Sequence, residues 1–291
     1  MPTARCNGIE IAYEDMGPKD GRPLVLVMGL GASLLFWEDG FCSALAERGH
    51  RVIRFDNRDV GLSTKLDQFG VPDVNQAFAS LMRREPIQAP YRLSDMARDT
   101  IGLMDHLGID RAHVVGASMG GMIVQTMAIE HPKRLRSMTS IMSSTSDPTL
   151  PQATAEAMAV LLRPPASNRN DFIEQSVPAW RVIGGQWFDE ARIRARAAAH
   201  FDRCYHPQGI ARQLVGILAS GDRTEKLRSV TTPTLVIHGA VDPLVPPAAG
   251  KATAAAIPGA ELMLVDGMGH DVVPHIWPTV VDAISRLSSR N

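Results

Sequence analysis

One serine between small residues is the first candidate for chemistry in this sequence. Ser118 stands in the stretch Gly116-Ala117-Ser118-Met119-Gly120, which matches the G-x-S-x-G pattern of a nucleophile elbow. An apolar run leads into it and a run with helical spacing leads out, so the serine would sit at a sharp strand-to-helix turn with small neighbours. The pattern predicts a nucleophile. The alternative is a buried loop serine that caps a helix.

A serine hydroxyl needs a general base, and His270 is the best placed of the nine histidines. It lies in the glycine-rich stretch "VDGMGHDVV", directly after the last apolar run. The other histidines fall in strand-like or helix-like runs or in the insertion described below, and His275 falls at the expected start of the final helix. We therefore expect His270 to activate Ser118. The alternative is an ordinary loop histidine.

The base in turn needs a buried acid that orients it. Asp242 follows the apolar run at 233–239 by three residues, in "HGAVDPLVP", and is our candidate. It could also be a simple turn residue before Pro243. Competing acids are Asp147, Asp266 and Asp271, of which the last two lie too close to the end of a strand or to His270 itself.

Two backbone amides are expected to stabilise the developing oxyanion. One belongs to Met119, the residue after the nucleophile. The other belongs to Leu30 in "VMGLGAS", where Gly29 and Gly31 would let the backbone approach a ligand. Alternatively, these glycines only make a tight turn.

The elements that would carry these residues are short apolar runs, most of them ending in glycine. Such runs suit strands buried on both faces of a parallel sheet. They occupy residues 23–29, 112–117, 233–239 and 261–267, with weaker members at 51–57 and 135–142. At the amino terminus, Asn7-Gly8 within an alternating run predicts an antiparallel hairpin instead.

Helix-like stretches separate these runs. The clearest covers residues 93–108, where Ser94 can cap the start and Gly108 can end the helix. Strand and helix therefore alternate, which predicts an α/β domain that binds its ligands at the carboxyl ends of the strands.

The alternation stops at about Ser146. From residue 147 to about residue 228 only helix-like segments are found, and four prolines are expected to interrupt them: Pro164, Pro165, Pro178 and Pro207. We expect a helical cap at 147–228 on a core domain formed by residues 1–146 and 229–291. Residues Met142, Trp180, Trp187, Phe188 and Met268 could line a substrate pocket.

Charge and cysteine content exclude several classes of protein. Thirty basic and 31 acidic residues leave a formal net charge of -1, so neither nucleic acid nor an anionic membrane is an expected partner. The three cysteines form no C-x-x-C pair, which argues against a disulfide framework and fits a reducing compartment. No apolar leader or membrane-length run is present, so we expect a cytoplasmic protein.

No metal or other cofactor is expected, because H-E-x-x-H and similar ligand patterns are missing. The stretch "ARIRARA" contains Arg192, Arg194 and Arg196. These could clamp an anionic substrate, but a solvated helix face is the simpler interpretation.

With Ser118, Asp242 and His270 in that chain order, each after a strand, the sequence resembles the α/β-hydrolase superfamily over essentially its whole length. The resemblance includes a cap between strands six and seven. The stretch "FDNRDVGLS" is similar to the loop that follows strand four in that superfamily, where Asp56 and Arg58 would be structural.

Within the superfamily, the sequence most resembles the branch of anthracycline methyl esterases and lipase-like carboxylesterases. One departure is Met28, where many relatives have histidine before the oxyanion glycine; backbone donors should not be affected by this exchange. The resemblance implies a serine carboxylesterase. The balanced net charge and the apolar candidate wall residues predict small to medium neutral esters as its substrates. A perhydrolase, a lactonase or a carbon-carbon bond hydrolase could use the same triad, and a non-catalytic ligand-binding protein could share the fold.

Overall fold

The computed structural model describes residues 1–290 and is built around an eight-stranded sheet with the order β1-β2-β4-β3-β5-β6-β7-β8. Strands β1 and β2 form the predicted antiparallel hairpin, and β2 pairs antiparallel with β4. From β4 to β8 all pairings are parallel. The strands are β1 (Thr3–Cys6), β2 (Ile9–Met16), β3 (Arg22–Val27), β4 (His50–Phe55), β5 (Ala112–Ala117), β6 (Leu135–Ile141), β7 (Thr234–Gly239) and β8 (Glu261–Val265).

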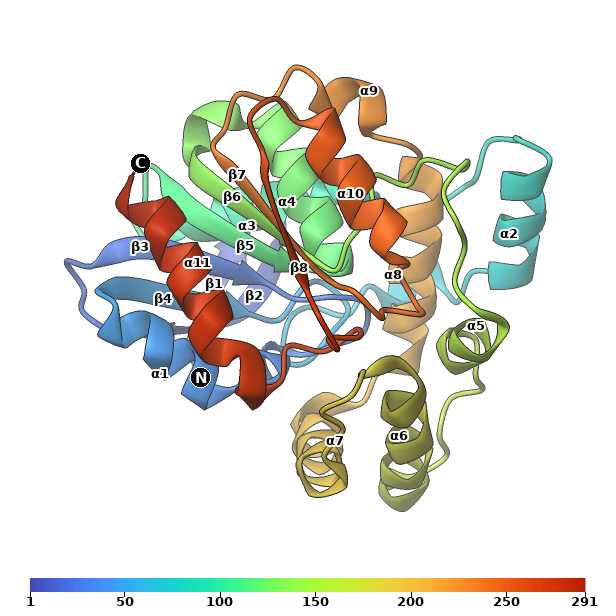
Figure 1. Ribbon diagram of the computed structural model, residues 1–291. Coiled ribbons are helices and arrows are strands. Elements are labelled where there is room, and N and C mark those ends of the chain that lie inside the picture. The colour runs from blue at the N-terminus through green and yellow to red at the C-terminus, as the bar shows by residue number, and fades with distance from the viewer. Residues whose placement is uncertain (291) are drawn as a thin grey trace.

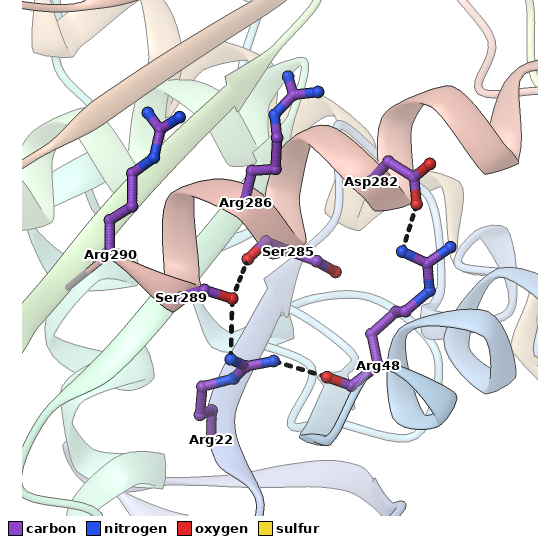
Figure 2. A pocket seen from close by; sticks show the side chains of 7 residues that line it. All are labelled: Arg22, Arg48, Asp282, Ser285, Arg286, Ser289 and Arg290. Atoms are coloured by element: carbon purple, nitrogen blue, oxygen red, sulfur yellow. Dashed lines mark hydrogen bonds and ion pairs between the residues drawn. The ribbon is translucent and has the colours of Figure 1, made fainter.

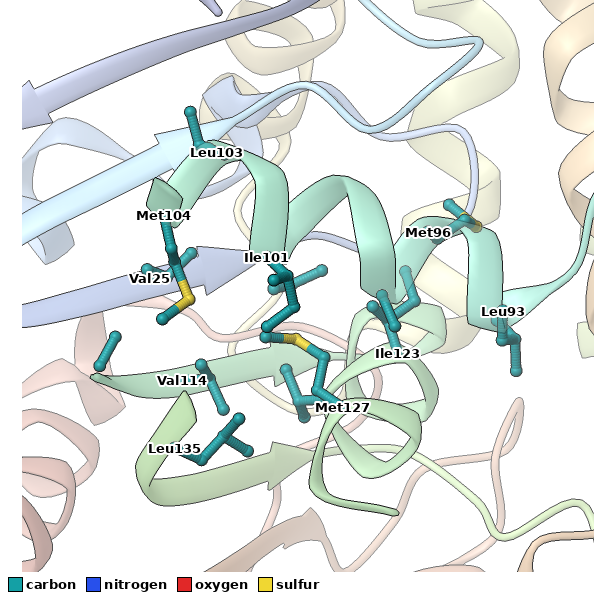
Figure 3. Close-up of a cluster of buried hydrophobic side chains, with 14 of the residues drawn as sticks. Val25, Leu93, Met96, Ile101, Leu103, Met104, Val114, Ile123, Met127 and Leu135 are labelled. Atoms are coloured by element: carbon teal, nitrogen blue, oxygen red, sulfur yellow. The ribbon is translucent and has the colours of Figure 1, made fainter. Parts of the chain in front are cut away.

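Helices cover both faces of this sheet (Figure 1). On one face, α3 (Leu93–His106) packs on α4 (Met119–Glu130), and α10 (Pro247–Ala256) joins them. The interior of this layer is a continuous apolar cluster, in which Met104 and Met127 contact side chains of the central strands (Figure 3). On the other face, α1 (Asp39–Glu47) and α11 (Trp277–Ser289) cover a second apolar cluster. The α/β expectation is therefore confirmed.

Two local expectations are wrong. Strand β8 is not buried on both faces, because it is the last strand of the sheet and pairs only with β7; Leu262 and Leu264 are 41% and 39% exposed. Ser94 does not cap α3, since the helix already begins at Leu93 after Arg92. The Ser94 hydroxyl instead donates to Glu130 of the neighbouring helix α4.

Between β6 and β7 the chain forms a run of helices, several of which lie beyond the carboxyl ends of the strands (Figure 1). Pro178 does not interrupt them as expected. It lies inside α6, which continues through the lost amide donor and packs along its length against α7. Pro207 is the first residue of α8. The helices are α5 (Ala155–Leu161), α6 (Arg169–Ile183), α7 (Glu190–Cys204), α8 (Pro207–Ser220) and α9 (Thr224–Leu227).

One further helix, α2 (Val74–Met82), lies outside the sheet layers and packs against α8. Within residues 1–290, no helix combines the length and apolar character needed to cross a bilayer.

Candidate active site

Ser118 occupies the sharp turn between β5 and α4. Its backbone has φ 55° and ψ -120°, a left-handed conformation that is strained for a residue with a side chain. The turn is held on both sides: the Ser118 amide donates to the carbonyl of Ile141 over 2.9 Å, and the Ser143 hydroxyl donates to the Ser118 carbonyl over 2.8 Å. The hydroxyl of Ser118 thereby faces a cavity at the carboxyl ends of the strands.

Two glycines make this turn possible. A Cβ atom on Gly116 would lie 2.1 Å from the carbonyl oxygen of Gly120, and a Cβ on Gly120 would lie 2.0 Å from the carbonyl oxygen of Val27. Both distances are far below van der Waals contact. The small residues of the motif are therefore required by the close approach of α4 to β5 and β3.

His270 and Asp242 are in direct contact. Their atoms Nδ1 and Oδ2 lie 2.7 Å apart, so a protonated Nδ1 donates to the carboxylate and leaves Nε2 as the basic nitrogen. The other oxygen of Asp242 accepts the amides of Leu244 and Val245, each over 2.9 Å. The Asp242 side chain is fully buried, and these bonds satisfy oxygens that no longer contact water. His270 lines the same cavity as Ser118.

The competing carboxylates are engaged elsewhere or lie outside. The Asp147 side chain accepts hydrogen bonds from Thr149 within its own turn, and Asp266 is exposed. Asp271 pairs with arginines of α7. Among these acids, Asp242 is thus the one that contacts His270.

His238 is a neighbour of this pair to which the sequence assigned no role. It lies within β7, where its Nε2 donates to the Val245 carbonyl over 2.7 Å and stands 3.8 Å from Asp242 Oδ2. Burial lowers the pKa of His238, so the ring is neutral near pH 7 and adds no charge beside the Asp242 carboxylate.

The loop after β3 closes over Ser118 from the other side. A Cβ on Gly29 would lie 3.0 Å from that of Ser118, and Leu30 and Met119 both line the cavity. As the first residue of α4, Met119 has an amide without a partner inside the helix. The loop is held in place by Gln213 of α8, whose Oε1 accepts the Gly31 amide over 2.8 Å.

A second contact from the inserted helices anchors the same loop. His200 of α7 places its Nδ1 2.9 Å from the Ser33 hydroxyl. Burial lowers the pKa of His200 to about 4, so this cavity-lining ring is neutral near pH 7. The resemblance gave no reason to single out His200 or Gln213, because both lie on helices remote in sequence from the loop.

The cavity has a volume of about 630 Å³ and mostly apolar walls. Two of the five residues expected at a substrate pocket, Met142 and Trp180, line this cavity. The expectation is wrong for three other residues, which are occupied elsewhere. Trp187 stacks on His275 with ring centroids 4.6 Å apart, Phe188 lies under the Arg181 guanidinium at 4.3 Å, and Met268 is completely buried in the core.

The arginines of α7 do not form a solvated face. The Arg194 side chain is 39% exposed, but those of Arg192 and Arg196 are only 11% and 5% exposed. Their Nη1 atoms lie 2.8 Å and 3.0 Å, respectively, from an oxygen of Asp271. Glu38 accepts from the same two arginines. Burial alone would raise the pKa of Asp271, but the two guanidinium groups outweigh it and hold the pKa at about 2.

This cluster joins α7 to the loop that carries His270. The Arg196 guanidinium also lies 4.3 Å from the ring centroid of Trp180, against the cavity. Helix α6 makes a further connection, because the Ile183 carbonyl accepts the His270 amide over 2.6 Å. The inserted helices therefore support both the histidine loop and the loop after β3.

The stretch "FDNRDVGLS" is also held internally. Asp56 accepts the amides of Leu34 and Leu62, each over 2.8 Å. The Arg58 guanidinium contacts both oxygens of Asp99, at 2.6 Å and 2.7 Å. The contact with Leu34 holds the loop after β4 against the segment that follows Ser33, and the contact with Asp99 holds it against α3.

A second hollow, of about 490 Å³, lies along α11 and the start of β3, away from Ser118 (Figure 2). Arginines dominate it, and its serines bond to Arg22 and to the helix backbone. The Ser285 hydroxyl lies 3.4 Å from Nε2 of His50, but burial lowers the pKa of His50 to about 4, so this histidine is a poor base near pH 7. Within residues 1–290, no group of three or more histidine, cysteine, aspartate or glutamate residues is arranged to hold a metal ion.

Comparisons with known proteins identify the family to which this fold belongs. A family model described as alpha/beta hydrolase fold matches residues 22–179, and a model described as TAP-like protein matches residues 216–287. The chain is 30% identical to the rhodomycin D methylesterase DnrP of Streptomyces peucetius, over 93% of this chain and 92% of that protein. It is 29% identical to a putative carbamate hydrolase, RutD, of Variovorax paradoxus, over 80% and 79% of the two chains.

Solved structures share the whole architecture. A meta-cleavage product hydrolase from Pseudomonas fluorescens superposes with a TM-score of 0.77 at 21% identity, covering 100% of this chain and 98% of that one. The esterase RhEst1 from a Rhodococcus species gives a TM-score of 0.76 at 20% identity, covering 99% and 97%. Taken with the elbow at Ser118 and the matched family model, these similarities show that the chain belongs to the α/β-hydrolase superfamily.

Proposed function

We propose that this protein is a serine hydrolase that cleaves carboxylic esters through an acyl-enzyme. The observation that carries the proposal is the contact of 2.7 Å between His270 and Asp242, at a cavity that Ser118 also lines. A nucleophile, a base and an orienting acid are the three parts that acyl transfer requires.

In the proposed reaction, Ser118 Oγ attacks the ester carbonyl while His270 Nε2 takes its proton. Asp242 holds the imidazole in the required tautomer and stabilises the imidazolium. The amides of Leu30 and Met119 donate to the oxyanion of the tetrahedral intermediate. His270 then protonates the leaving alcohol, and the ester bond breaks to leave an acyl group on Ser118.

Water completes the cycle. His270 takes a proton from the water that attacks the acyl-enzyme. The second tetrahedral intermediate then collapses as His270 returns this proton to Ser118 Oγ, which releases the acid. The same machinery would support lactone opening, carbon-carbon cleavage or perhydrolysis, which differ in the acyl donor or in the attacking nucleophile. Peracid formation from acetate and hydrogen peroxide would identify the last of these.

For the substrate, we propose a small to medium ester. The name of DnrP describes action on a methyl ester, and RhEst1 is named an esterase; both support ester chemistry over other acyl donors. Residues 147–228 would serve as a cap over the cavity, with Trp180 and Met142 as apolar walls. A volume of about 630 Å³ suits a small molecule. Rates that rise steadily to the longest lipid esters would contradict this proposal.

The decisive experiment is active-site labelling with a fluorophosphonate, whose tetrahedral phosphorus mimics the acyl-transfer transition state. One adduct per chain should form, on Ser118 rather than on Ser33, Ser63 or Ser143. Ser118→Ala should also lower kcat on a chromogenic acetate by about 10⁶.

A matched pair of histidine variants tests the base. His270→Ala should abolish labelling and leave the circular dichroism spectrum unchanged, because the loss is chemical. His275→Ala removes an exposed histidine a few residues away and should label normally. An unlabelled wild-type protein, or an adduct on another serine, would refute the mechanism and favour a ligand-binding protein.

A further inference from the structure

One charged side chain in the cavity wall, that of Arg163, has no ion-pair partner within residues 1–290. The charged side chains that line the cavity within residues 1–290 include Arg196 and Asp271, which pair with each other. Arg163 also lines the cavity, but it forms no ion pair; its Nη1 donates to the backbone carbonyl of Gln175 over 2.5 Å. The wall therefore has an excess positive charge at Arg163.

This guanidinium is partly removed from water. Burial lowers the pKa of Arg163, and no nearby carboxylate offsets the effect. A desolvated cation without a counterion is costly. An anion bound beside Arg163 would reduce that cost, because arginine can donate two parallel hydrogen bonds to a carboxylate.

A second donor lies beside it. The hydroxyl oxygen of Tyr205 accepts the amide of Ala166 over 2.8 Å, so its own proton can be donated to a ligand. Tyr205 also lines the cavity and interacts electrostatically with Arg163. Its ring packs against Phe172 and Phe201, with centroids 4.9 Å and 5.0 Å away, which fixes the direction of the hydroxyl.

Arg163 and His270 both contact helix α6, at different positions along its length. The Ile183 carbonyl accepts the amide of His270, and the Gln175 carbonyl accepts Arg163. These two positions are eight residues apart on one helix, which corresponds to about 12 Å at 1.5 Å per residue. Arg163 and the backbone of His270 thus contact α6 about two turns apart, so Arg163 does not lie beside the proposed base.

We infer that Arg163 and Tyr205 form a carboxylate-binding subsite in the wall of the cavity that Ser118 also lines. The preferred substrates are then esters that carry a second, free carboxylate several bonds away from the ester group. This inference rests on the proposed ester hydrolysis and replaces the expectation of neutral substrates, which came from net charge and from side chains visible only as sequence.

The test compares two substrates that differ only at the remote end. One is the monomethyl ester of a linear dicarboxylic acid of medium length, and the other is the same ester with a primary amide in place of the free acid. At low salt the wild-type protein should favour the acid by about tenfold in kcat/KM, as expected for one charge-assisted contact. In a series of chain lengths, the preference for the acid should peak at intermediate length.

Variants assign the preference to the subsite. Arg163→Gln should bring the acid-to-amide ratio close to one, mainly through KM for the acid. Arg163→Lys should retain part of the preference for the acid, and Tyr205→Phe should lower this preference by less than Arg163→Gln does. The matched control is Arg169→Gln, which removes an equal charge from an exposed ion pair with Asp202 at the start of α6 and should leave the ratio unchanged.

Labelling with the fluorophosphonate distinguishes failure of the proposed subsite from failure of the proposed ester hydrolysis. If Arg163→Gln loses activity on both substrates equally, or if the wild-type protein shows no preference for the acid, the subsite does not exist while ester hydrolysis stands. If the wild-type protein hydrolyses neither ester and does not react with the fluorophosphonate, the proposed function itself fails. Normal labelling of Arg163→Gln shows that the variant is folded.

Discussion

Replacing Asp271 with asparagine should destabilise the fold by about 3 kcal/mol, because removal of one partner from a buried ion pair typically costs about 3–5 kcal/mol. Asp271 is 6% exposed and contacts two arginines from α7, at 2.8 Å and 3.0 Å. The loss should fall at the low end of the range, since Glu38 still accepts from both arginines in the variant.

The pKa of Asp271 gives a second value for its contribution to the free energy of unfolding. It falls from 3.8 to about 2 on folding, and each unit corresponds to about 1.36 kcal/mol, so ionised Asp271 contributes about 2 kcal/mol. Because the folded-state pKa is the lower one, this contribution is complete above about pH 4. It is lost as the pH falls from about 4 to about 2.

Urea denaturation at pH 7 measures the free energy of unfolding of the wild-type protein and of Asp271→Asn. The control is Glu174→Gln, which removes a carboxylate from the exposed pair with Arg194 and should not change stability measurably. The difference between wild-type and Asp271→Asn should be constant from pH 7 to pH 5. Equal stability of Asp271→Asn and Glu174→Gln would show that the buried cluster does not hold α7 to the histidine loop.

Three further predictions concern single positions. Asp242→Asn should lower kcat by about 10⁴ by favouring the wrong histidine tautomer, whereas Asp266→Asn, at an exposed position, should retain activity. A larger loss for Asp266→Asn than for Asp242→Asn would show that Asp242 is not the acid of the triad. Gly120→Ala should prevent soluble expression, because its Cβ would lie 2.0 Å from a backbone oxygen at the end of β3; a folded, active variant would contradict the packing described. Cys204 should be the one thiol that reacts with a disulfide reagent in the native protein, since the other two cysteines are buried and burial raises their pKa to about 11 and about 12; mass spectrometry of the labelled protein would reveal modification at either buried site.

The elbow could be predicted from sequence because its constraints are local. The turn at Ser118 needs small residues at 116 and 120, and the steric contact that excludes larger ones forms within a few residues of chain or against the adjacent strand. The boundaries of β5 could also be predicted from the sequence, since this strand covers residues 112–117 as expected. Continuous apolar runs report burial on both faces of a parallel sheet.

The placement of Asp242 and His270 followed from topology. In a parallel sheet the carboxyl ends of the strands meet at one edge, so two loops after neighbouring strands were expected to meet. The structure places their side chains 2.7 Å apart. The same reasoning failed at β8, because an apolar run does not reveal that its strand has a neighbour on one side only.

The cavity walls depended on tertiary structure. Trp187 and Phe188 have the same apolar character as Trp180, yet only Trp180 lines the cavity. Arg192 and Arg196 look like surface cations in sequence, but Asp271 lies about eighty residues away along the chain and becomes their partner only after α7 packs on the histidine loop. Arg163 shows the opposite case, a cation that folding leaves without a carboxylate. Periodicity records which face of an element is apolar, whereas the identity of the opposing group is set by contacts between segments distant in sequence, and only the folded chain brings these together.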